Sequence, residues 1–354
     1  MKIKIGKKII SEKSKTYFIA DIGANHDGSL SRAKKLIQLC AKAGADAAKF
    51  QHFKANTIVS DYGFKKIGKI THQKNWNKSV FQVYQNASIN NQWTKILKKE
   101  CDKYNIDFMT SPYDLNYVDS VNKYIKAYKI GSGDITWKEI IIKIAKKKLP
   151  LILATGASSL IEVKNAVNLI NKYKKKFILM QCNTNYTNEI KNFNYLNLNE
   201  FKTFKKIFKD KIILGLSDHT QGHSAVISAV TLGARVVEKH FTDNNNRSGP
   251  DHAFAMNPQT WEAMVDETRK IELALGDGEK IVEKNEIQSS IVQRRCIRVN
   301  KDLKINHKIK KKDLVFLRPA PKNSISPFNF EKIINKKLKK SIKAGDCISW
   351  NKIK

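Results

Sequence analysis

The chain has 354 residues, 41% of them hydrophobic, which is enough to bury a large core in one large domain with a smaller one, or in two of middle size. It has no run of about 18 apolar residues, which excludes a membrane-spanning helix. The net charge of +34 comes mostly from lysines spread over expected helix faces and loops, which favours a solvated surface over a nucleic-acid site.

The cysteines indicate a reducing compartment. There are five, with no C-x-x-C pair: Cys40, Cys101, Cys182, Cys296 and Cys347. An odd number without framework spacing suits free thiols. The basic N-terminal stretch lacks the apolar core and cleavage site of a signal peptide. We therefore expect a cytoplasmic protein without a membrane or nucleic-acid partner, whose positive field attracts a small anionic substrate.

Apolar runs alternate with helical patterns along most of the chain. Strands are predicted at residues 17–21, 45–50, 106–110, 127–130, 150–155, 177–182, 212–216 and 234–238. Helices are predicted at residues 29–43, 92–104, 118–124, 137–147, 160–173, 198–208, 224–232 and 258–275. A polar segment, residues 54–91, follows the second strand. Eight strand–helix units favour an α/β fold of the (β/α)8 TIM-barrel type over an open doubly wound sheet.

The pattern changes after about residue 276. Short β-like pieces separated by turns are expected at residues 294–299, 304–309, 314–318 and 347–350. A linker around residues 276–290 precedes them. We expect a barrel domain over residues 1–280 and a small β-rich domain over residues 281–354.

Polar residues follow all eight predicted strands, at the ends where TIM barrels carry their active sites. The last two strands end in Ser217-Asp218-His219 and Lys239-His240. Two neutral imidazoles on neighbouring parallel strands can hold one divalent metal ion and leave positions open for water or substrate oxygen. The alternative is that either histidine only caps its strand.

Other strand ends predict an anion site. Lys49 and Lys129 end the second and fourth strands, and Gln51 lies beside Lys49. Hydroxyls lie at further strand ends, namely Ser111, Ser132, Thr155 and Ser217. Such groups suit a small doubly charged anion, although isolated surface lysines and helix caps are the alternative. Asp21 and Asp134 are candidates for proton transfer or for stabilising a developing cation.

Several of these segments carry a resemblance to the sialic acid (N-acetylneuraminate) synthase family. They are Phe18–Gly28, Lys49–Gln51, Lys129–Asp134, Ala154–Ala157, Leu216–Thr220, Glu238–Thr242 and Gly249–Asp251. The tail, with Leu317-Arg318-Pro319 and Ile325-Ser326-Pro327, resembles the antifreeze-like (SAF) domain of that family. The resemblance covers essentially the whole chain.

The resemblance implies an enzyme, a transferase that forms a carbon–carbon bond between phosphoenolpyruvate and an open-chain N-acetylated amino-hexose. The products would be a sialic-acid-type nonulosonic acid and phosphate, by metal-assisted aldehyde activation and C–O cleavage. His219 and His240 match ligands of Mn²⁺, or another divalent metal. Asp21 and Asp134 stand where the family usually has glutamate.

The resemblance also implies substrate contacts. The matching positions for phosphoenolpyruvate are Lys49, Ser111, Lys129, Ser132 and Ser217, with Gln51 and Thr155 in the same matching segments. Tyr186 and Asp251 match sugar-side positions. Arg318 matches an arginine that reaches the active site of the partner subunit in a domain-swapped homodimer.

Four alternatives stay open at this point. The acceptor is N-acetylmannosamine or a diacetamido-dideoxyhexose, because residues 182–186 and 134–137 differ from the usual family sequence. A related barrel would make another 3-deoxy-ulosonic acid from a phosphorylated sugar. The shorter carboxylates at Asp21 and Asp134 fit a catalytically weakened homologue. The lysines fit a nucleic-acid-binding module, which leaves the polar strand ends unexplained.

Overall fold

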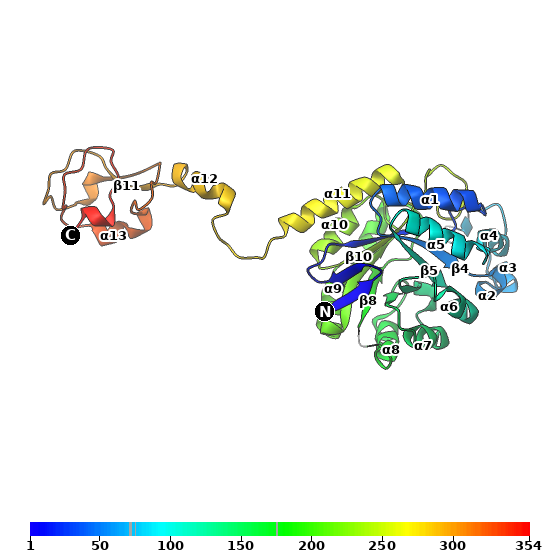
Figure 1. Cartoon of the computed structure of the whole chain (residues 1–354). Helices are drawn as coiled ribbons and strands as arrows, with labels where there is room; N and C mark the ends of the chain where they lie inside the picture. Colours follow the sequence, from blue (N-terminus) through cyan, green and yellow to red (C-terminus); the bar gives the residue numbers. More distant parts are fainter. Residues whose placement is uncertain (71–72, 75, 175) are drawn as a thin grey trace. The chain divides into compact units, whose positions relative to one another are not determined.

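The computed structural model describes residues 1–354 apart from 71–72, 75 and 175. The chain forms two compact units, Met1–Gly276 and Asp277–Lys354. Figure 1 shows the strands of the first unit surrounded by helices. None of the helices in the described part of the chain is long and apolar enough to span a membrane.

The first unit is a closed barrel of eight parallel strands, which confirms the predicted TIM-barrel fold. The strands pair in the order β10-β3-β4-β5-β6-β7-β8-β9. They are β3 (Tyr17–Asp21), β4 (Ala47–His52), β5 (Asp107–Pro112), β6 (Tyr128–Ile130), β7 (Leu151–Ala154), β8 (Phe177–Cys182), β9 (Ile212–Asp218) and β10 (Val236–His240). Several strands run one or two residues beyond the predicted ends, because the polar residues there still pair with the next strand.

Amphipathic helices cover the barrel. They are α1 (Leu30–Lys42), α5 (Trp93–Lys103), α6 (Leu115–Val121), α7 (Lys138–Ala145), α8 (Leu160–Asn171), α9 (Glu200–Phe208), α10 (Ser224–Thr231) and α11 (Pro258–Ala274). Local sequence sets several starts: Ser29 caps α1, Ser159 caps α8, and Asn257 caps α11 just before a proline. Three short helices, α2 (Ala55–Ile58), α3 (Asp61–Ile67) and α4 (Val80–Ala87), lie in the polar segment where the sequence predicts none.

An N-terminal hairpin packs against the barrel interior. Strands β1 (Lys2–Ile5) and β2 (Lys8–Ser11) are antiparallel. Their side chains Ile3, Ile5 and Ile10 join one buried cluster with Tyr17, at the start of β3, and with other inward-facing residues of the barrel strands. The hairpin therefore closes the amino end of the barrel, and the carboxyl ends of the strands remain for a site.

The second unit has a small apolar core of its own. Its strands β11 (Cys296–Val299) and β12 (Leu314–Leu317) are antiparallel, and its helices are α12 (Ile287–Val292) and α13 (Phe330–Ile333). The expected pieces at residues 304–309 and 347–350 form only isolated bridges. This small antiparallel unit agrees with the expected β-rich SAF-type domain. The boundary expected between residues 280 and 281 remains a prediction.

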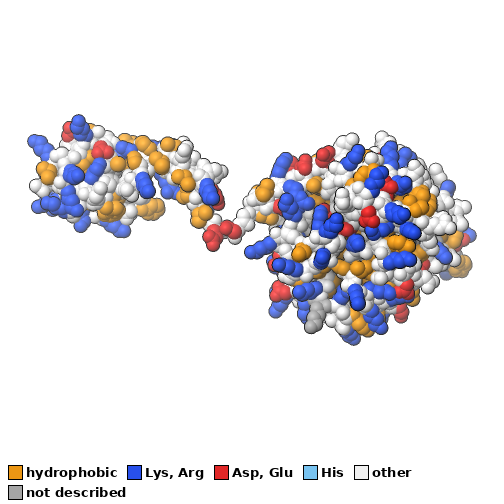
Figure 2. Space-filling view, viewed as in Figure 1, with side chains coloured by type: hydrophobic (Ala, Val, Ile, Leu, Met, Phe, Trp, Pro, Cys, Tyr) orange, Lys and Arg blue, Asp and Glu red, His pale blue; other side chains and the backbone are white. Residues whose placement is uncertain are grey.

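Lysine and arginine side chains are scattered over the visible face of the barrel in Figure 2, among uncharged and acidic side chains. The charge distribution on this face matches a solvated surface.

Cys40 and Cys101 are buried among the helices, and all five cysteines are free.

Gly215 in β9 offers a test of the packing inside the barrel. A Cβ atom there would lie 2.9 Å from the Val236 carbonyl oxygen and 2.9 Å from Met180 Cγ. Because a backbone oxygen cannot move aside cheaply, we expect Gly215→Ala to lower the free energy of unfolding by about 1–3 kcal/mol in urea titrations. Gly133→Ala is the control, since its Cβ would meet nothing within 4 Å. Equal stability of the two variants would contradict this packing.

Candidate active site

Four buried charged side chains form a connected series at the carboxyl end of the barrel. Lys49 Nζ lies 2.7 Å from Asp21 Oδ2 and 3.5 Å from Glu238 Oε1. Lys129 Nζ lies 2.7 Å from the same Glu238 oxygen. Each of these side chains is at most 6% exposed. The two cations are therefore balanced by two anions while no ligand is bound.

The electrostatics keep Asp21 and Lys49 ionised. Burial alone would raise the pKa of Asp21, but Lys49 above all, and then His240, hold that pKa below its ordinary value. Burial would lower the pKa of Lys49, yet the Asp21 and Glu238 carboxylates raise it above its ordinary value. Both partners are therefore charged at neutral pH.

Hydroxyl and amide groups surround the lysines. Lys49 Nζ lies 3.5 Å from Ser111 Oγ, and Gln51 Nε2 lies 3.2 Å from Asp21 Oδ2. The Gly156 amide donates to Ser132 Oγ at 2.9 Å. Such groups can donate hydrogen bonds to a phosphate or carboxylate next to the two ammonium groups.

Two other expected hydroxyls differ in their surroundings. Ser217 is buried and lies in register with Glu238 across β9 and β10. Thr155 donates its hydroxyl to the Met180 carbonyl at 2.9 Å, so that group already has a partner within the sheet. Ser217 therefore lies on the Glu238 side of the strands, whereas the Thr155 hydroxyl is engaged with the backbone.

The two histidines lie side by side, His219 directly after β9 and His240 at the end of β10, with ring centroids 5.6 Å apart. His219 Nδ1 lies 2.8 Å from the Asn183 carbonyl oxygen. Since a carbonyl only accepts, Nδ1 carries the proton and Nε2 has a free lone pair. His240 Nδ1 is buried and has no hydrogen-bond partner among the described residues. It lies 3.7 Å from Asp251 Oδ2.

These two imidazoles fit a divalent metal ion. One has its tautomer fixed by a carbonyl, as is usual for metal-binding histidines, and the other has an unpartnered buried nitrogen. No group of three or more histidine, cysteine or acidic side chains arranged for a metal occurs within the described ranges. The histidines would therefore supply two ligands, and oxygen atoms of water or substrate would supply the others.

A buried ion pair immediately precedes both histidines. Lys239 Nζ lies 2.5 Å from Asp218 Oδ2, and these side chains are 1% and 0% exposed. The two residues are direct register partners on β10 and β9. Lys239 also donates to the Thr220 carbonyl at 2.7 Å. The pair fixes the two strand ends against each other, and so fixes where His219 and His240 emerge.

Asp134 is a candidate carboxylate whose pKa is raised by burial. It ends a single 3₁₀ turn, Ser132–Asp134, directly after the Gly131 that follows β6. Burial raises the pKa of Asp134 to about 6. A carboxylate with such a pKa can exchange a proton near neutral pH, which suits acid–base work.

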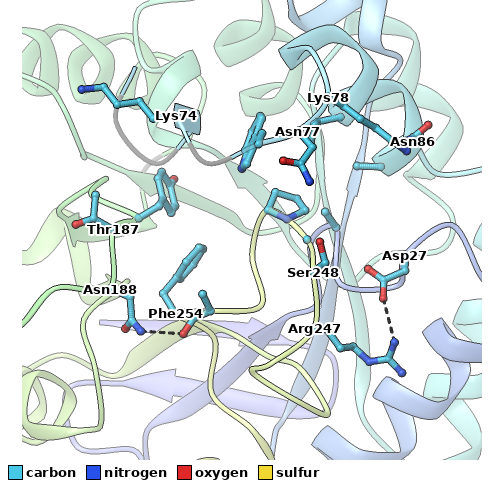
Figure 3. Close-up of a pocket in the computed structure, with 18 of the residues that line it drawn as sticks. Asp27, Lys74, Asn77, Lys78, Asn86, Thr187, Asn188, Arg247, Ser248 and Phe254 are labelled. Atoms are coloured by element: carbon cyan, nitrogen blue, oxygen red, sulfur yellow. Dashed lines mark hydrogen bonds and ion pairs between the residues drawn. The ribbon is translucent and has the colours of Figure 1, made fainter. Parts of the chain in front are cut away.

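A cavity of about 1200 Å³ opens among the loops beyond the strand ends, and Figure 3 shows residues that line it. Its walls come from segments at residues 24–28, 74, 76–78, 186–189 and 247–254 and from helix α4. Tyr186 and Phe254 line the cavity and also contact His219, with ring centroids 4.5 Å and 6.1 Å away. The cavity therefore borders two aromatic rings whose other neighbours are the imidazoles.

Asp251 joins the cavity wall to the strand ends. Its Oδ2 accepts from the Ala24 amide at 3.2 Å and lies near His240. A Cβ on Gly23 would come within 2.8 Å of the same oxygen and within 3.3 Å of His240 Cε1. Gly23 has φ +49°, so glycine serves both the backbone conformation and the close approach.

The expected site residues of the barrel all lie at its carboxyl end or on the adjoining loops. Arg318 is the exception, since it is an exposed residue just after β12 in the second unit. Glu238 and the Asp218–Lys239 pair were not among the expected site residues. Glu238 lies two residues before His240, so strand alternation places both on one face, and this signal was present in the sequence.

Comparisons with known proteins cover the same regions. The NeuB family model matches residues 36–280, and a SAF domain model matches residues 294–354. The N,N′-diacetyllegionaminic acid synthase of Campylobacter jejuni is 36% identical over 338 residues, covering 94% of this chain and 99% of that protein. The synthase of the same name from Legionella pneumophila is 33% identical over 346 residues, covering 95% and 94%.

A solved structure agrees with the fold. The N-acetylneuraminic acid (sialic acid) synthetase of Leptospira borgpetersenii, crystallised with citrate, superposes with a TM-score of 0.71 at 28% identity. The match covers 82% of this chain and 95% of that one.

The Asp218–Lys239 pair yields a stability test. Lys239→Met leaves the Asp218 carboxylate buried without its cation, so we expect it to lower the free energy of unfolding by about 3–5 kcal/mol. Adding Asp218→Asn removes the stranded charge while Oδ1 still accepts from Thr220, and should recover most of this loss. Urea unfolding followed by circular dichroism measures both. A double variant no more stable than Lys239→Met would contradict the role of the pair.

Proposed function

We propose an acceptor and a mechanism for this chain, which belongs to the NeuB family and is therefore a synthase that condenses phosphoenolpyruvate with an amino sugar. The acceptor is an open-chain N-acetylated amino-hexose, and the products are a nonulosonic acid and phosphate. The observation that carries the proposal is the charged series from Asp21 to Lys129, whose Asp21 lies 3.7 Å from His240 of the paired imidazoles.

The acceptor we favour is a diacetamido-dideoxyhexose rather than N-acetylmannosamine. Both relatives described above, at 36% and 33% identity, carry the name N,N′-diacetyllegionaminic acid synthase. The cavity of about 1200 Å³ has room for a hexose with two acetamido groups, since drug-sized ligands occupy about 300–1000 Å³.

Phosphoenolpyruvate binds at the strand ends in this proposal. Its phosphate and carboxylate bind the ammonium groups of Lys49 and Lys129. These ammonium groups also keep their contacts with Asp21 and Glu238. The hydroxyl and amide partners are Gln51, Ser111, Ser132 and Ser217, with Thr155 supporting the β7 end through its bond to Met180. The buried oxygen Glu238 Oε2, which lacks a partner among the described residues, can accept from the bound substrate or water.

His219 and His240 hold a divalent metal ion, with Mn²⁺ the ion we favour. When bound, the ion supplies Lewis-acid polarisation of the sugar aldehyde, which lowers the barrier to attack. Tyr186 and Phe254 shield this position from bulk water, since both rings pack against the imidazoles. Asp251, close to His240, positions a sugar hydroxyl.

The carboxylates act on the phosphoenolpyruvate side. C3 of phosphoenolpyruvate attacks the aldehyde carbon, the aldehyde oxygen gains a proton from water, and positive charge develops at C2. Asp134 stabilises that charge and takes a proton from the water that adds to C2. The bond from C2 to the phosphate oxygen then breaks, the new C2 hydroxyl gives up its proton to the leaving phosphate, and C2 becomes a ketone. Asp21 keeps Lys49 ionised and aligned through its 2.7 Å contact.

We further propose that Arg318 completes the site from a partner subunit in a domain-swapped homodimer. The side chain is exposed and follows β12 in the second unit, so it is free to contact another molecule. Its guanidinium would bind oxygen atoms of the sugar or of phosphoenolpyruvate.

The activity itself is tested by phosphate release from phosphoenolpyruvate with Mn²⁺, across N-acetylmannosamine, its 6-phosphate and a diacetamido-dideoxyhexose. We expect release with the diacetamido sugar above the others, and loss of release on adding a chelator, because the aldehyde is then no longer polarised. His219→Ala and His240→Ala should each abolish release and weaken Mn²⁺ binding measured by electron paramagnetic resonance.

Two results would contradict the metal assignment: full turnover after chelation, or unchanged Mn²⁺ binding in both histidine variants. Lys164→Ala, an exposed position on α8, serves as the control for general charge effects.

The raised pKa of Asp134 predicts a pH dependence. Because the carboxylate must be ionised to stabilise charge, kcat should fall as pH drops through about 6, the value to which burial raises the pKa. Asp134→Asn should lower kcat about 100- to 1000-fold and remove this limb from the profile. The phosphate of the substrate still titrates in the variant, so a limb that persists there would assign the titration to substrate and refute the role of Asp134.

A further inference from the structure

Two carboxylates and two arginines lie where the loop after β3 meets the loop after β10. Arg32 donates to both oxygens of Asp243, at 2.9 Å and 2.5 Å, and its Nε lies 3.0 Å from Asp27 Oδ2. The Arg32 side chain is only 10% exposed. His252 Nε2 lies 2.9 Å from the other oxygen of Asp27. Both carboxylates are thus well satisfied by buried partners.

Arg247 is held much more loosely by the same carboxylates. Its Nη1 lies 3.7 Å from Asp27 Oδ2, and its Nε lies 3.3 Å from Asp243 Oδ1. Its side chain is 44% exposed and lines the cavity. Figure 3 shows Arg247 and Asp27 on one side of the cavity and Thr187 with Asn188 on the other. Because Arg32 and His252 already bind the carboxylates of Asp27 and Asp243, the Arg247 guanidinium retains N–H donors for a ligand.

We infer that Arg247 binds acceptor oxygens at the end of the sugar remote from its aldehyde, and so determines which acceptor is used. The inference rests on the proposed function, since it takes the aldehyde to react at the histidine pair. The planar guanidinium of Arg247 would donate hydrogen bonds to a carbonyl or phosphate oxygen, and its fixed pair of N–H donors gives that contact a defined geometry. A distal acetamido carbonyl and a distal phosphate are the two sources of such oxygens.

The shape of the cavity supports the distal position. Tyr186 and Phe254 mark the inner end, because they pack against the imidazoles. Arg247 lies on the part of the wall tied to the β3–α1 loop through Asp27. The lysines proposed for phosphoenolpyruvate lie at the strand ends and are absent from the described cavity lining. A sugar with its aldehyde at the histidines therefore extends its other end into the cavity that Arg247 borders.

The position of Arg247 is maintained by its neighbours. A Cβ atom added at Gly249 would lie only 2.6 Å from His252 Cδ2. The loop therefore packs closely over His252. His252 is buried and also lies 2.7 Å from Thr242 Oγ1 through Nδ1. These contacts hold the loop that carries Arg247, while its own side chain remains 44% exposed at the cavity.

Steady-state KM values for three acceptors test the inference. They are a diacetamido-dideoxyhexose, N-acetylmannosamine and N-acetylmannosamine 6-phosphate, assayed with wild type, Arg247→Ala, Arg247→Lys and the control Lys164→Ala. If the partner is an acetamido carbonyl, Arg247→Ala should raise KM about 10- to 100-fold for the diacetamido sugar and much less for N-acetylmannosamine. If the partner is a phosphate, the large increase in KM should occur with N-acetylmannosamine 6-phosphate, and Arg247→Lys should lose less affinity than Arg247→Ala.

The KM for phosphoenolpyruvate should move far less than the KM for the sugar. Equal increases for all three acceptors, or none, would overturn the inference, because Arg247 would then not read the distal group. The same change in Lys164→Ala would attribute the effect to overall charge.

A binding measurement separates this inference from the proposed function. Trp76 lines the same cavity, so tryptophan fluorescence titrated with each sugar reports binding without turnover, and Trp76→Phe assigns the signal. Lack of turnover by wild type with every acceptor would contradict the proposed function. Binding of all the sugars by Arg247→Ala as tightly as by wild type would overturn the inference alone.

Discussion

Two ammonium groups can stay buried at the carboxyl end of this barrel only because carboxylates lie against them. Removing a charge from water costs several kcal/mol, and a close partner of opposite sign is what offsets that cost. Lys49 and Lys129 meet this need through Asp21 and Glu238. The same arrangement suits a substrate that brings negative charges, since the anion meets cations that are already buried and ordered.

Strand alternation distributes the roles around the site. In β10, Glu238 and His240 share a face with Val236, which packs in the barrel interior. Val237 packs among the helices, and Lys239 shares its face and pairs with Asp218. One strand therefore supplies a carboxylate and an imidazole to the site, and between them a lysine that anchors the strand to its neighbour.

Much of this was accessible from the sequence, for reasons of periodicity. The eight strands, their polar ends and the family resemblance were all readable, because buried parallel strands appear as short branched runs. Alternation would also have indicated Glu238, and would have set Thr155 apart, since it follows the inward-facing Ala154 and bonds Met180 instead.

The loop contacts were not accessible in the same way. Arg32 meets Asp243, and Asp27 meets His252, across separations of 211 and 225 residues. No local pattern encodes such pairings, and the helices within residues 54–91 are too short to leave a periodic signal.

The division between strands and loops explains how one scaffold can serve several sugars. In the mechanism we propose, the chemistry on phosphoenolpyruvate depends on side chains that leave strand ends within a hydrogen-bonded barrel, where small displacements are costly. The cavity for the other substrate is bounded by loops, which tolerate substitution because fewer packed neighbours depend on them. Relatives named for legionaminic acid and for sialic acid therefore need differ only along the loop walls, and a residue such as Arg247, loosely held on such a wall, lies where that difference can be made without disturbing the reacting groups.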